Sequence, residues 1–215
     1  MTTLFDEYLN RVTDEFASRN NISELKTGRK EFFDTIGTVH EEDPFFETYM
    51  TAFLDWYIFD RDFSGKDLPP IRLFYRNHFK ELSDEEKKIY NDFTKFRHSL
   101  FYVKKIRKDL LALQDLYNDD ILKIESHLVV SGFKEGDIFD AILVPFKGEW
   151  HFTKSFCFHP TEAGKFIFKE MKKIKHMEQK ILMRTILKFK KLRLKLERYP
   201  HVSARQIYNE EEFNK

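Results

Sequence analysis

Cysteine is almost absent from this sequence of 215 residues, which contains only Cys157. A single thiol excludes disulfides within the chain and the paired Cys-x2-Cys motifs of structural zinc sites. The first residues show neither the basic nor the apolar region of a signal peptide, and no apolar run reaches the length of a membrane span. We therefore expect a cytoplasmic protein without a membrane span.

Glycine is also scarce. The seven glycines form neither G-x-x-x-x-G-K-[ST] nor G-x-G-x-x-G, the loops that hold phosphate groups. The G-x-S-x-G and H-E-x-x-H motifs of hydrolases and metalloproteases are absent as well. These absences remove the common enzyme classes, so the sequence favours a protein without catalytic activity and implies no cofactor.

Aromatic and charged residues are abundant instead. Aromatic residues make up 16% of the chain and include 24 Phe, while charged residues make up 34% with nearly equal numbers of each sign. Phe removes a large apolar area from water, so a sizeable core is feasible in one large domain or two small ones.

Helical periodicity dominates residues 1–97. Apolar side chains recurring every three or four residues, together with capping signals, predict helices over 5–16, 23–36, 44–59, 70–79 and 84–96. The clearest start is the capping box Ser83-Asp84-Glu85-Glu86, in which Ser83 and Glu86 satisfy each other's backbone amides.

The hydrophobic period changes to two at about His98. Short alternating or apolar segments predict strands over 100–106, 110–116, 121–127, 138–144 and 149–153, with a further edge at 155–158. Strands this short and closely spaced suggest a small antiparallel sheet or a partly open barrel.

One long basic helix is expected over residues 161–199, and Pro200 ends it. The predicted organisation is an α+β fold with a helical unit at 1–97, a small β unit at 98–160, the basic helix at 161–199 packing on the rest, and a loosely held tail at 200–215.

A resemblance covers about residues 45–150. The helix end Phe53-Leu54-Asp55-Trp56-Tyr57-Ile58-Phe59-Asp60 is followed by matching stretches at 65–74, 82–90 and 136–145. These stretches, taken in this order, resemble those of a group of uncharacterised bacterial proteins. The resemblance implies a bacterial source and a shared fold, but it implies no activity. Some members of that group end in a Cys/His zinc motif similar to the one at the C-terminus of SecA. This chain lacks that motif, so the resemblance implies no zinc site here.

Asp55, Asp60 and Asp62 gather near one helix end beside Trp56. Paired carboxylates with one raised pKa can act as acid and base, and clustered acids can hold a hard cation. A metal-dependent enzyme that uses Asp55 and Asp60 is therefore an alternative hypothesis. The favoured interpretation is structural: Asp55 bonds to core amides or an Arg, while Asp60 and Asp62 shape the exit turn.

His151, Cys157 and His159 form a second candidate group. Alternate residues of a strand face the same side, and zinc accepts imidazole and thiolate ligands, with His127 or an acidic residue as the candidate fourth ligand. The favoured interpretation is a free, half-buried Cys and two surface histidines. Nucleophilic chemistry at Cys157 is disfavoured, because the flanking Phe156 and Phe158 would raise the thiol pKa.

The basic helix is the strongest positive feature. Residues 165–198 contain thirteen basic and three acidic residues, a net charge of +10, so the rest of the chain carries −9. The predicted nucleic-acid-binding residues are Lys172, Lys173, Lys175, Lys188, Lys190, Lys191, Arg193 and Lys195.

These cations predict a binding module for an acidic macromolecule, with RNA or DNA ahead of an acidic protein. Alternatively the helix only docks on the acidic N-terminal half. A homodimeric scaffold that pairs through an apolar stripe along 181–196 is a further hypothesis.

Overall fold

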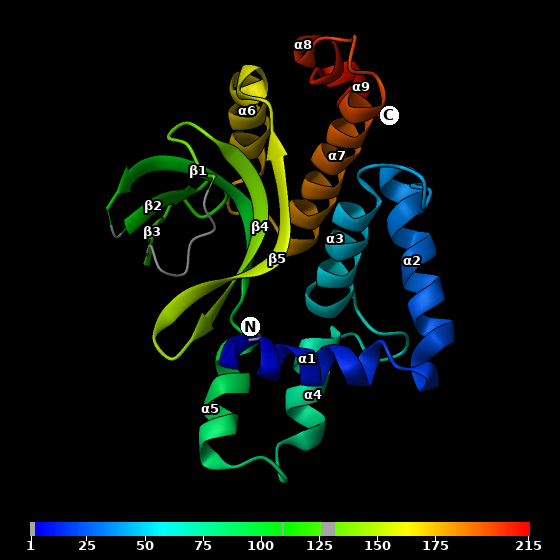
Figure 1. The fold of residues 1–215 in the computed structure, drawn as a ribbon, viewed down its shortest axis with the longest axis vertical. Coiled ribbons are helices and arrows are strands. Elements are labelled where there is room, and N and C mark those ends of the chain that lie inside the picture. Colours follow the sequence, from blue (N-terminus) through cyan, green and yellow to red (C-terminus); the bar gives the residue numbers. More distant parts are fainter. Residues whose placement is uncertain (1–2, 109, 126–131) are drawn as a thin grey trace. The chain divides into compact units, whose positions relative to one another are not determined.

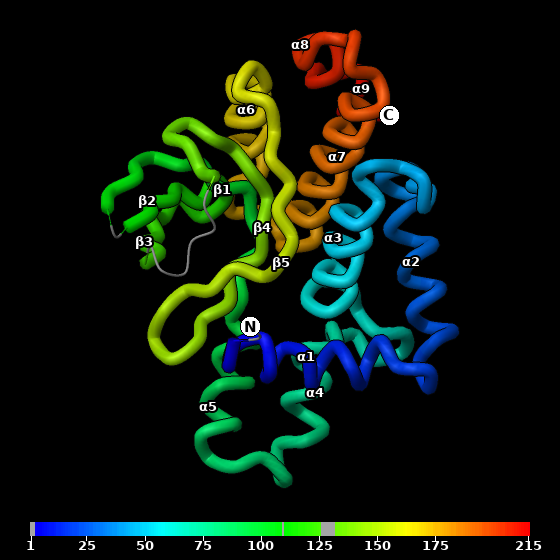
Figure 2. Tube along the Cα trace, viewed as in Figure 1, coloured from blue at the N-terminus to red at the C-terminus, as the bar shows by residue number. Residues whose placement is uncertain are grey.

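The computed structural model describes residues 3–108, 110–125 and 132–215. These residues form two compact units, and the chain passes between them several times (Figure 2). Unit 1 contains residues 1–34, 39–97 and 143–155, and unit 2 contains residues 35–38, 98–142 and 156–215. Neither unit is therefore one continuous stretch of sequence.

The five helices predicted in the N-terminal part are all present. They are α1 (Leu4–Phe16), α2 (Ile22–Ile36), α3 (Phe46–Phe59), α4 (Pro70–His78) and α5 (Asp84–Phe93), with a 3-10 turn η1 (Arg19–Asn21). The capping box that begins α5 is confirmed, because Ser83 Oγ accepts from Glu86 N and Ser83 N donates to Glu86 Oε2. Helix α3 begins two residues later than predicted, since Asp43 accepts from the His40 amide and shapes a turn instead.

Aromatic side chains fill the core of unit 1. Two buried tyrosines also fix neighbouring helices through their hydroxyls: Tyr57 donates to the Phe16 carbonyl at 3.2 Å, and Tyr90 donates to the Tyr8 carbonyl at 3.2 Å. The Phe5 and Phe93 rings lie 5.5 Å apart between α1 and α5. The periodic aromatic residues of the sequence thus become one packed helical core.

The predicted strands form one five-stranded antiparallel sheet, ordered β3-β2-β1-β4-β5. Its members are β1 (Arg97–Arg107), β2 (Leu110–Asp115), β3 (Ile121–Glu125), β4 (Ile138–Phe146) and β5 (Glu149–His159). The sheet is open, with β3 and β5 at its edges, so the barrel alternative is not realised. The two segments predicted at 149–153 and 155–158 are one strand, and the predicted end of β3 at His127 lies outside the described residues.

The prediction of a single helix over residues 161–199 is wrong. The chain forms η3 (Thr161–Ala163), α6 (Gly164–Ile174) and α7 (Gln179–Arg198), and it reverses direction between the two long helices (Figure 1). At the reversal Met177 N donates to Ile174 O, and His176 adopts a positive φ of 63°. No Gly or Pro marks this turn, so local sequence gave no signal for it.

Both helices pack on the same core of unit 2, beside the strands (Figure 1). This core joins residues of β1, β4, η3, α6 and α7, and the residue after β2, to the C-terminal segment. Its members are Leu100, Leu116, Ile138, Ala163, Ile167, Met171, Leu182, Ile186, Phe189, Leu192, Ile207, Tyr208 and Phe213. The apolar stripe of α7 is thus buried and offers no exposed patch of the kind that the dimeric-scaffold hypothesis required.

The last fifteen residues are not a loose tail. They form the short helices α8 (Ala204–Ile207) and α9 (Glu210–Phe213), and Ile207, Tyr208 and Phe213 are buried in the unit 2 core. Helices of four residues are too short to show a period, so the sequence pattern could not reveal them. Within the described ranges, no helix has both the length and the apolarity needed to cross a bilayer.

Candidate binding surface and buried polar cluster

Cations recur along one face of α6 and along one face of α7. Apart from the adjacent Lys172 and Lys173, the spacings are three or four residues, which places successive side chains beside one another on a helix. We call these nine residues the basic surface: Lys165, Lys169, Lys172 and Lys173 on α6, and Lys180, Arg184, Lys188, Lys191 and Lys195 on α7.

The acidic helix α9 lies against this basic surface. Glu210 Oε1 is 2.5 Å from Lys169 Nζ and 3.8 Å from Lys173 Nζ, and Glu212 accepts from Lys195. Lys169 and Lys173 belong to α6 whereas Lys195 belongs to α7, so the carboxylates of α9 bridge the two helices.

An aromatic anchor accompanies the two carboxylates. The Phe213 ring lies 4.8 Å from the Phe189 ring and 5.5 Å from the Phe166 ring, and the Lys188 ammonium lies 4.9 Å from the centre of the Phe213 ring. A cation above an aromatic ring is attracted by the electron-rich face. The basic surface therefore accommodates two carboxylates and one aromatic side chain together.

The contacts between the α9 carboxylates and the lysines change the pKa values of both kinds of side chain. Hydrogen bonds from Lys195 and Lys215 lower the pKa of Glu212 to about 2. The bond to Lys169 lowers the pKa of Glu210, and the same bond raises the pKa of Lys169. Both carboxylates are consequently ionised at neutral pH, as an electrostatic contact with lysine requires.

Part of the basic surface stays uncovered. Lys165, Lys172, Lys180 and Arg184 are exposed, and they make no ion pair or hydrogen bond with any residue that the structure describes. Lys191 is half-buried and likewise unpaired within the described ranges. These cations are available to a partner.

The eight cations predicted from the sequence fall into two groups. Lys172, Lys173, Lys188, Lys191 and Lys195 belong to the basic surface. In the second group, Lys190 is buried, Lys175 pairs with Asp119 at 2.8 Å, and Arg193 pairs with Glu197 at 3.1 Å. The prediction missed Lys165, Lys169, Lys180 and Arg184, although helical spacing from the predicted lysines would have found them.

Lys190 instead belongs to a buried polar cluster in unit 2. Its ammonium donates to Oδ1 of Asp140 on β4, whose other oxygen, Oδ2, lies 3.6 Å from His159 Nε2 on β5. His98 Nε2 on β1 lies 3.8 Å from Oδ1, and the other ring nitrogen of His159, Nδ1, is 2.9 Å from the Tyr208 hydroxyl. Asp140 and Lys190 are each only 1% exposed.

Charge compensation explains how this cluster tolerates burial. Burial alone would raise the pKa of Asp140, but the Lys190 ammonium and the neighbouring imidazoles hold that pKa well below its usual range. Burial lowers the pKa of His159, which favours the neutral imidazole. Asp140 and Lys190 therefore form an ion pair with no net charge, as buried charges require.

Cys157 lies in the same cluster, and burial raises the pKa of its thiol. A raised pKa favours the protonated thiol over the nucleophilic thiolate. The ligand atoms of Asp140, Cys157 and His159 nevertheless all lie within 4.8 Å of one another.

Of the predicted group His151, Cys157 and His159, the structure thus brings Cys157 and His159 together. His151 does not lie beside them. His151 lies six positions before Cys157 along β5, which corresponds to a rise of about 20 Å. His151 stacks on Phe5 at 5.0 Å and meets Phe146 edge-on in unit 1, and His127 lies outside the described residues. The sequence did carry one unused signal, because Asp140 is the only charged residue in the apolar strand β4.

Asp55 has a structural role in unit 1. Its Oδ2 accepts a hydrogen bond from the backbone amide of Ser155 on β5 at 3.2 Å. Asp60 is the C-cap of α3, where its amide donates to the Trp56 carbonyl. Asp62 lies in the irregular segment that follows α3. The enzyme hypothesis gains no support from these positions.

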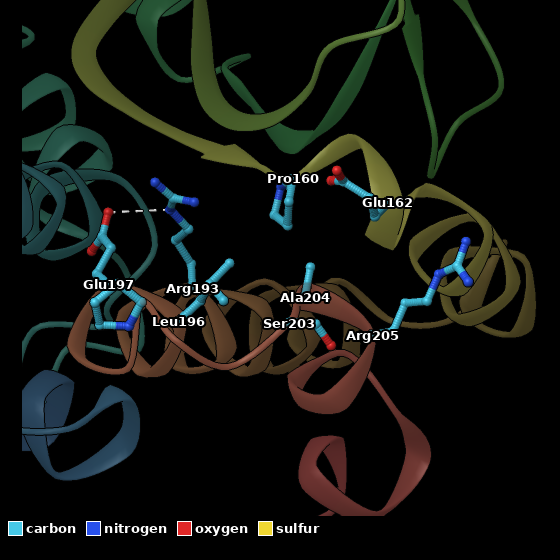
Figure 3. A pocket seen from close by; sticks show the side chains of 9 residues that line it. Pro160, Glu162, Arg193, Leu196, Glu197, Ser203, Ala204 and Arg205 are labelled. Atoms are coloured by element: carbon cyan, nitrogen blue, oxygen red, sulfur yellow. Dashed lines mark hydrogen bonds and ion pairs between the residues drawn. The ribbon is translucent and has the colours of Figure 1, made fainter.

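An open pocket of about 550 Å³ lies near the C-terminal end of α7 in unit 2 (Figure 3). Its lining contains two arginines, Arg193 and Arg205, and two glutamates, Glu162 and Glu197. The lining is therefore neutral overall and selects neither anions nor cations by net charge. For this reason the basic surface is the stronger candidate for function.

Comparison with known proteins gives a family but no activity. One family model matches residues 14–192 of the chain, and that family is described as one of unknown function. Neither the curated proteins nor the solved structures include a significant match to this chain.

Proposed function

This chain belongs to DUF7986, a family of unknown function, and we propose that it is a non-enzymatic binding protein for an acidic segment of another protein. The proposed site is the basic surface of α6 and α7. Binding would use the uncovered cations first and would extend to the lysines that α9 occupies.

The single observation that supports this proposal is α9 itself. The sequence Glu210-Glu211-Glu212-Phe213 places two carboxylates on lysines of both helices and one aromatic ring under Lys188. The chain thus carries on its own basic surface an example of the ligand chemistry that we propose. A competing acidic segment would make the same charge-assisted hydrogen bonds.

Nucleic acid, predicted ahead of acidic protein from the sequence, is the competing ligand. Binding of a nucleic-acid backbone needs many unpaired cations along one surface, because the affinity for nucleic acid grows with the number of phosphates that are neutralised. Burial of Lys190 and the ion pairs of Lys175 and Arg193 reduce that number. We therefore place an acidic protein segment ahead of RNA or DNA.

Fluorescence anisotropy tests the proposal with a labelled peptide of sequence Asn-Glu-Glu-Glu-Phe, copied from residues 209–213, and with a single-stranded RNA oligonucleotide of matched charge. We expect the full chain to bind the peptide, with affinity falling about threefold or more when salt rises from roughly 50 to 150 mM, because exposed charges are screened.

Charge reversal identifies the surface that binds. The double change Lys172→Glu/Arg184→Glu should weaken peptide binding at least tenfold, whereas Lys66→Glu, an exposed lysine of unit 1, should not. Salt-sensitive binding of the RNA without binding of the peptide would replace our proposal with nucleic-acid binding. Equal binding by all three proteins would exclude the basic surface.

A further inference from the structure

We propose a zinc site in unit 2 whose protein ligands are Asp140 Oδ2, Cys157 Sγ and His159 Nε2. It is independent of the proposed binding function. The three residues are all buried, and they form the one group of this kind among the residues that the structure describes. Their donors are an oxygen, a sulfur and an imidazole nitrogen, a combination that favours zinc over Mg²⁺ or Ca²⁺.

Two unsatisfied atoms point to a ligand at this place. Asp140 Oδ2 and His159 Nε2 are fully buried, and neither has a hydrogen-bond partner in the described part of the chain. Buried polar atoms without a partner are uncommon, because each loses its hydrogen bonds to water. A cation between them would satisfy both atoms at once.

The separations are close to those of a zinc site. The three donor atoms lie within 4.8 Å of one another, and Oδ2 is 3.6 Å from Nε2. Donors bound to tetrahedral zinc at 2.0–2.3 Å are separated by about 3.3–3.8 Å. A side-chain movement of roughly one ångström therefore completes the geometry, with a fourth position left for a non-protein ligand, as in many zinc sites.

The surrounding residues suit the role of outer partners. Lys190 bonds Oδ1 of Asp140, which leaves Oδ2 for the metal, and the Tyr208 hydroxyl bonds Nδ1 of His159, which directs Nε2 toward Asp140. Such contacts orient metal ligands in zinc proteins. When Zn²⁺ binds, a Zn–S bond replaces the S–H bond of Cys157, and the released proton passes to solvent.

Metal binding by the full chain tests this site directly. The protein is stripped with a chelator, incubated with Zn²⁺ or Co²⁺, and dialysed. Elemental analysis should then find about one metal per chain. The Co²⁺ form should show a near-ultraviolet thiolate-to-metal charge-transfer band together with the intense visible bands of four-coordinate cobalt.

Conservative variants locate the ligands. Cys157→Ser and His159→Gln should each lower metal affinity at least about tenfold, whereas His151→Gln, the matched control in unit 1, should not. Circular dichroism checks that each variant is folded. Failure of the wild-type chain to retain metal, or a Co²⁺ spectrum without the thiolate band, overturns the proposal even where a variant does not fold.

Discussion

Lys190 shows how a charge that sequence analysis assigned to a surface can belong to a core. The residue lies on α7 between the buried Phe189 and the half-buried Lys191, and its ammonium reaches Asp140 on β4. Two opposite charges can leave water together only when they are paired, so Asp140 and Lys190 depend on each other.

Removal of the Lys190 ammonium should therefore lower the stability of the folded protein. We expect Lys190→Met to lower the free energy of unfolding by about 3–5 kcal/mol, since Asp140 would stay buried without its partner. The neighbouring change Lys191→Met should alter it by no more than about 0.5 kcal/mol, because Lys191 has no partner in the described ranges. Urea denaturation with a chelator present measures both, and a Lys190→Met protein as stable as wild type would contradict the assignment.

His78 provides a pH-dependent contact in unit 1. Its two ring nitrogens face Glu81 at 3.0 Å and Glu15 of α1 at 2.8 Å. The hydrogen bond to Glu81 raises the pKa of His78, burial opposes this rise, and Glu15 adds to it.

A raised folded-state pKa means that the folded protein binds the proton more tightly than the unfolded chain. The contact therefore stabilises unit 1 fully at pH values below the unfolded pKa of about 6.5, and this stabilisation is lost as the pH rises through the folded pKa. NMR titration should find a His78 pKa above the ordinary value and a lower one in Glu15→Gln. A His78 pKa below the ordinary value would disprove the contact.

Among the elements, α2 and α3 approach each other closely at Gly28. A Cβ atom built there would lie 2.9 Å from Tyr57 Cδ2 and 3.2 Å from Arg61 Cδ. Arg61 is held by Glu24 at 2.5 Å and by Glu31 at 2.6 Å, so its side chain has little freedom to move away. Close packing of the two helices therefore requires glycine at position 28.

Gly28→Ala should consequently destabilise the protein. Alanine gains about 1 kcal/mol of helix propensity over glycine, but overpacking typically costs about 1–3 kcal/mol. We expect a net loss of stability in thermal or urea unfolding, with Lys26→Ala on the exposed face of α2 as the control. A stabilised Gly28→Ala protein would mean that the two helices are not in close contact.

Elements with strong local patterns were predictable, and those set by tertiary packing were not. The capping box at Ser83 and the short alternating or apolar segments after His98 are local signals. Helix α5 and the five strands form at the predicted places, although the segments 149–153 and 155–158 join into β5. The break between α6 and α7 arises because both apolar stripes pack on one core, a condition that no short window contains. The buried polar cluster was only half predictable, since Cys157 and His159 are strand neighbours but Asp140 comes from another strand.

At the scale of the whole molecule, unit 2 depends on the C-terminal segment. Ile207, Tyr208 and Phe213 belong to its core, and the Tyr208 hydroxyl contacts His159. A chain that ends after Arg198 should therefore be strongly destabilised, because truncation of single large core side chains already costs about 2–5 kcal/mol.

Thermal unfolding followed by circular dichroism checks this expectation. The matched control ends after Phe213 and lacks only the exposed Asn214 and Lys215. If the chain ending after Arg198 melts at the wild-type temperature, the C-terminal segment is not part of the core.

The proposed binding function requires that α9 occupies a surface suited to an acidic segment, and the charges of α9 can be removed without changing Phe213. Peptide anisotropy with the Glu210→Gln/Glu212→Gln protein measures this directly, since the double change frees Lys169 and removes the α9 carboxylates from Lys173 and Lys195, while Lys173 keeps its ion pair with Glu170. Glu211→Gln is the control, because Glu211 pairs only with Lys215 within the described residues. We predict several-fold tighter binding of the acidic peptide by the double variant and no change for the control. Equal affinity in all three proteins, or no binding by any of them, would contradict the account.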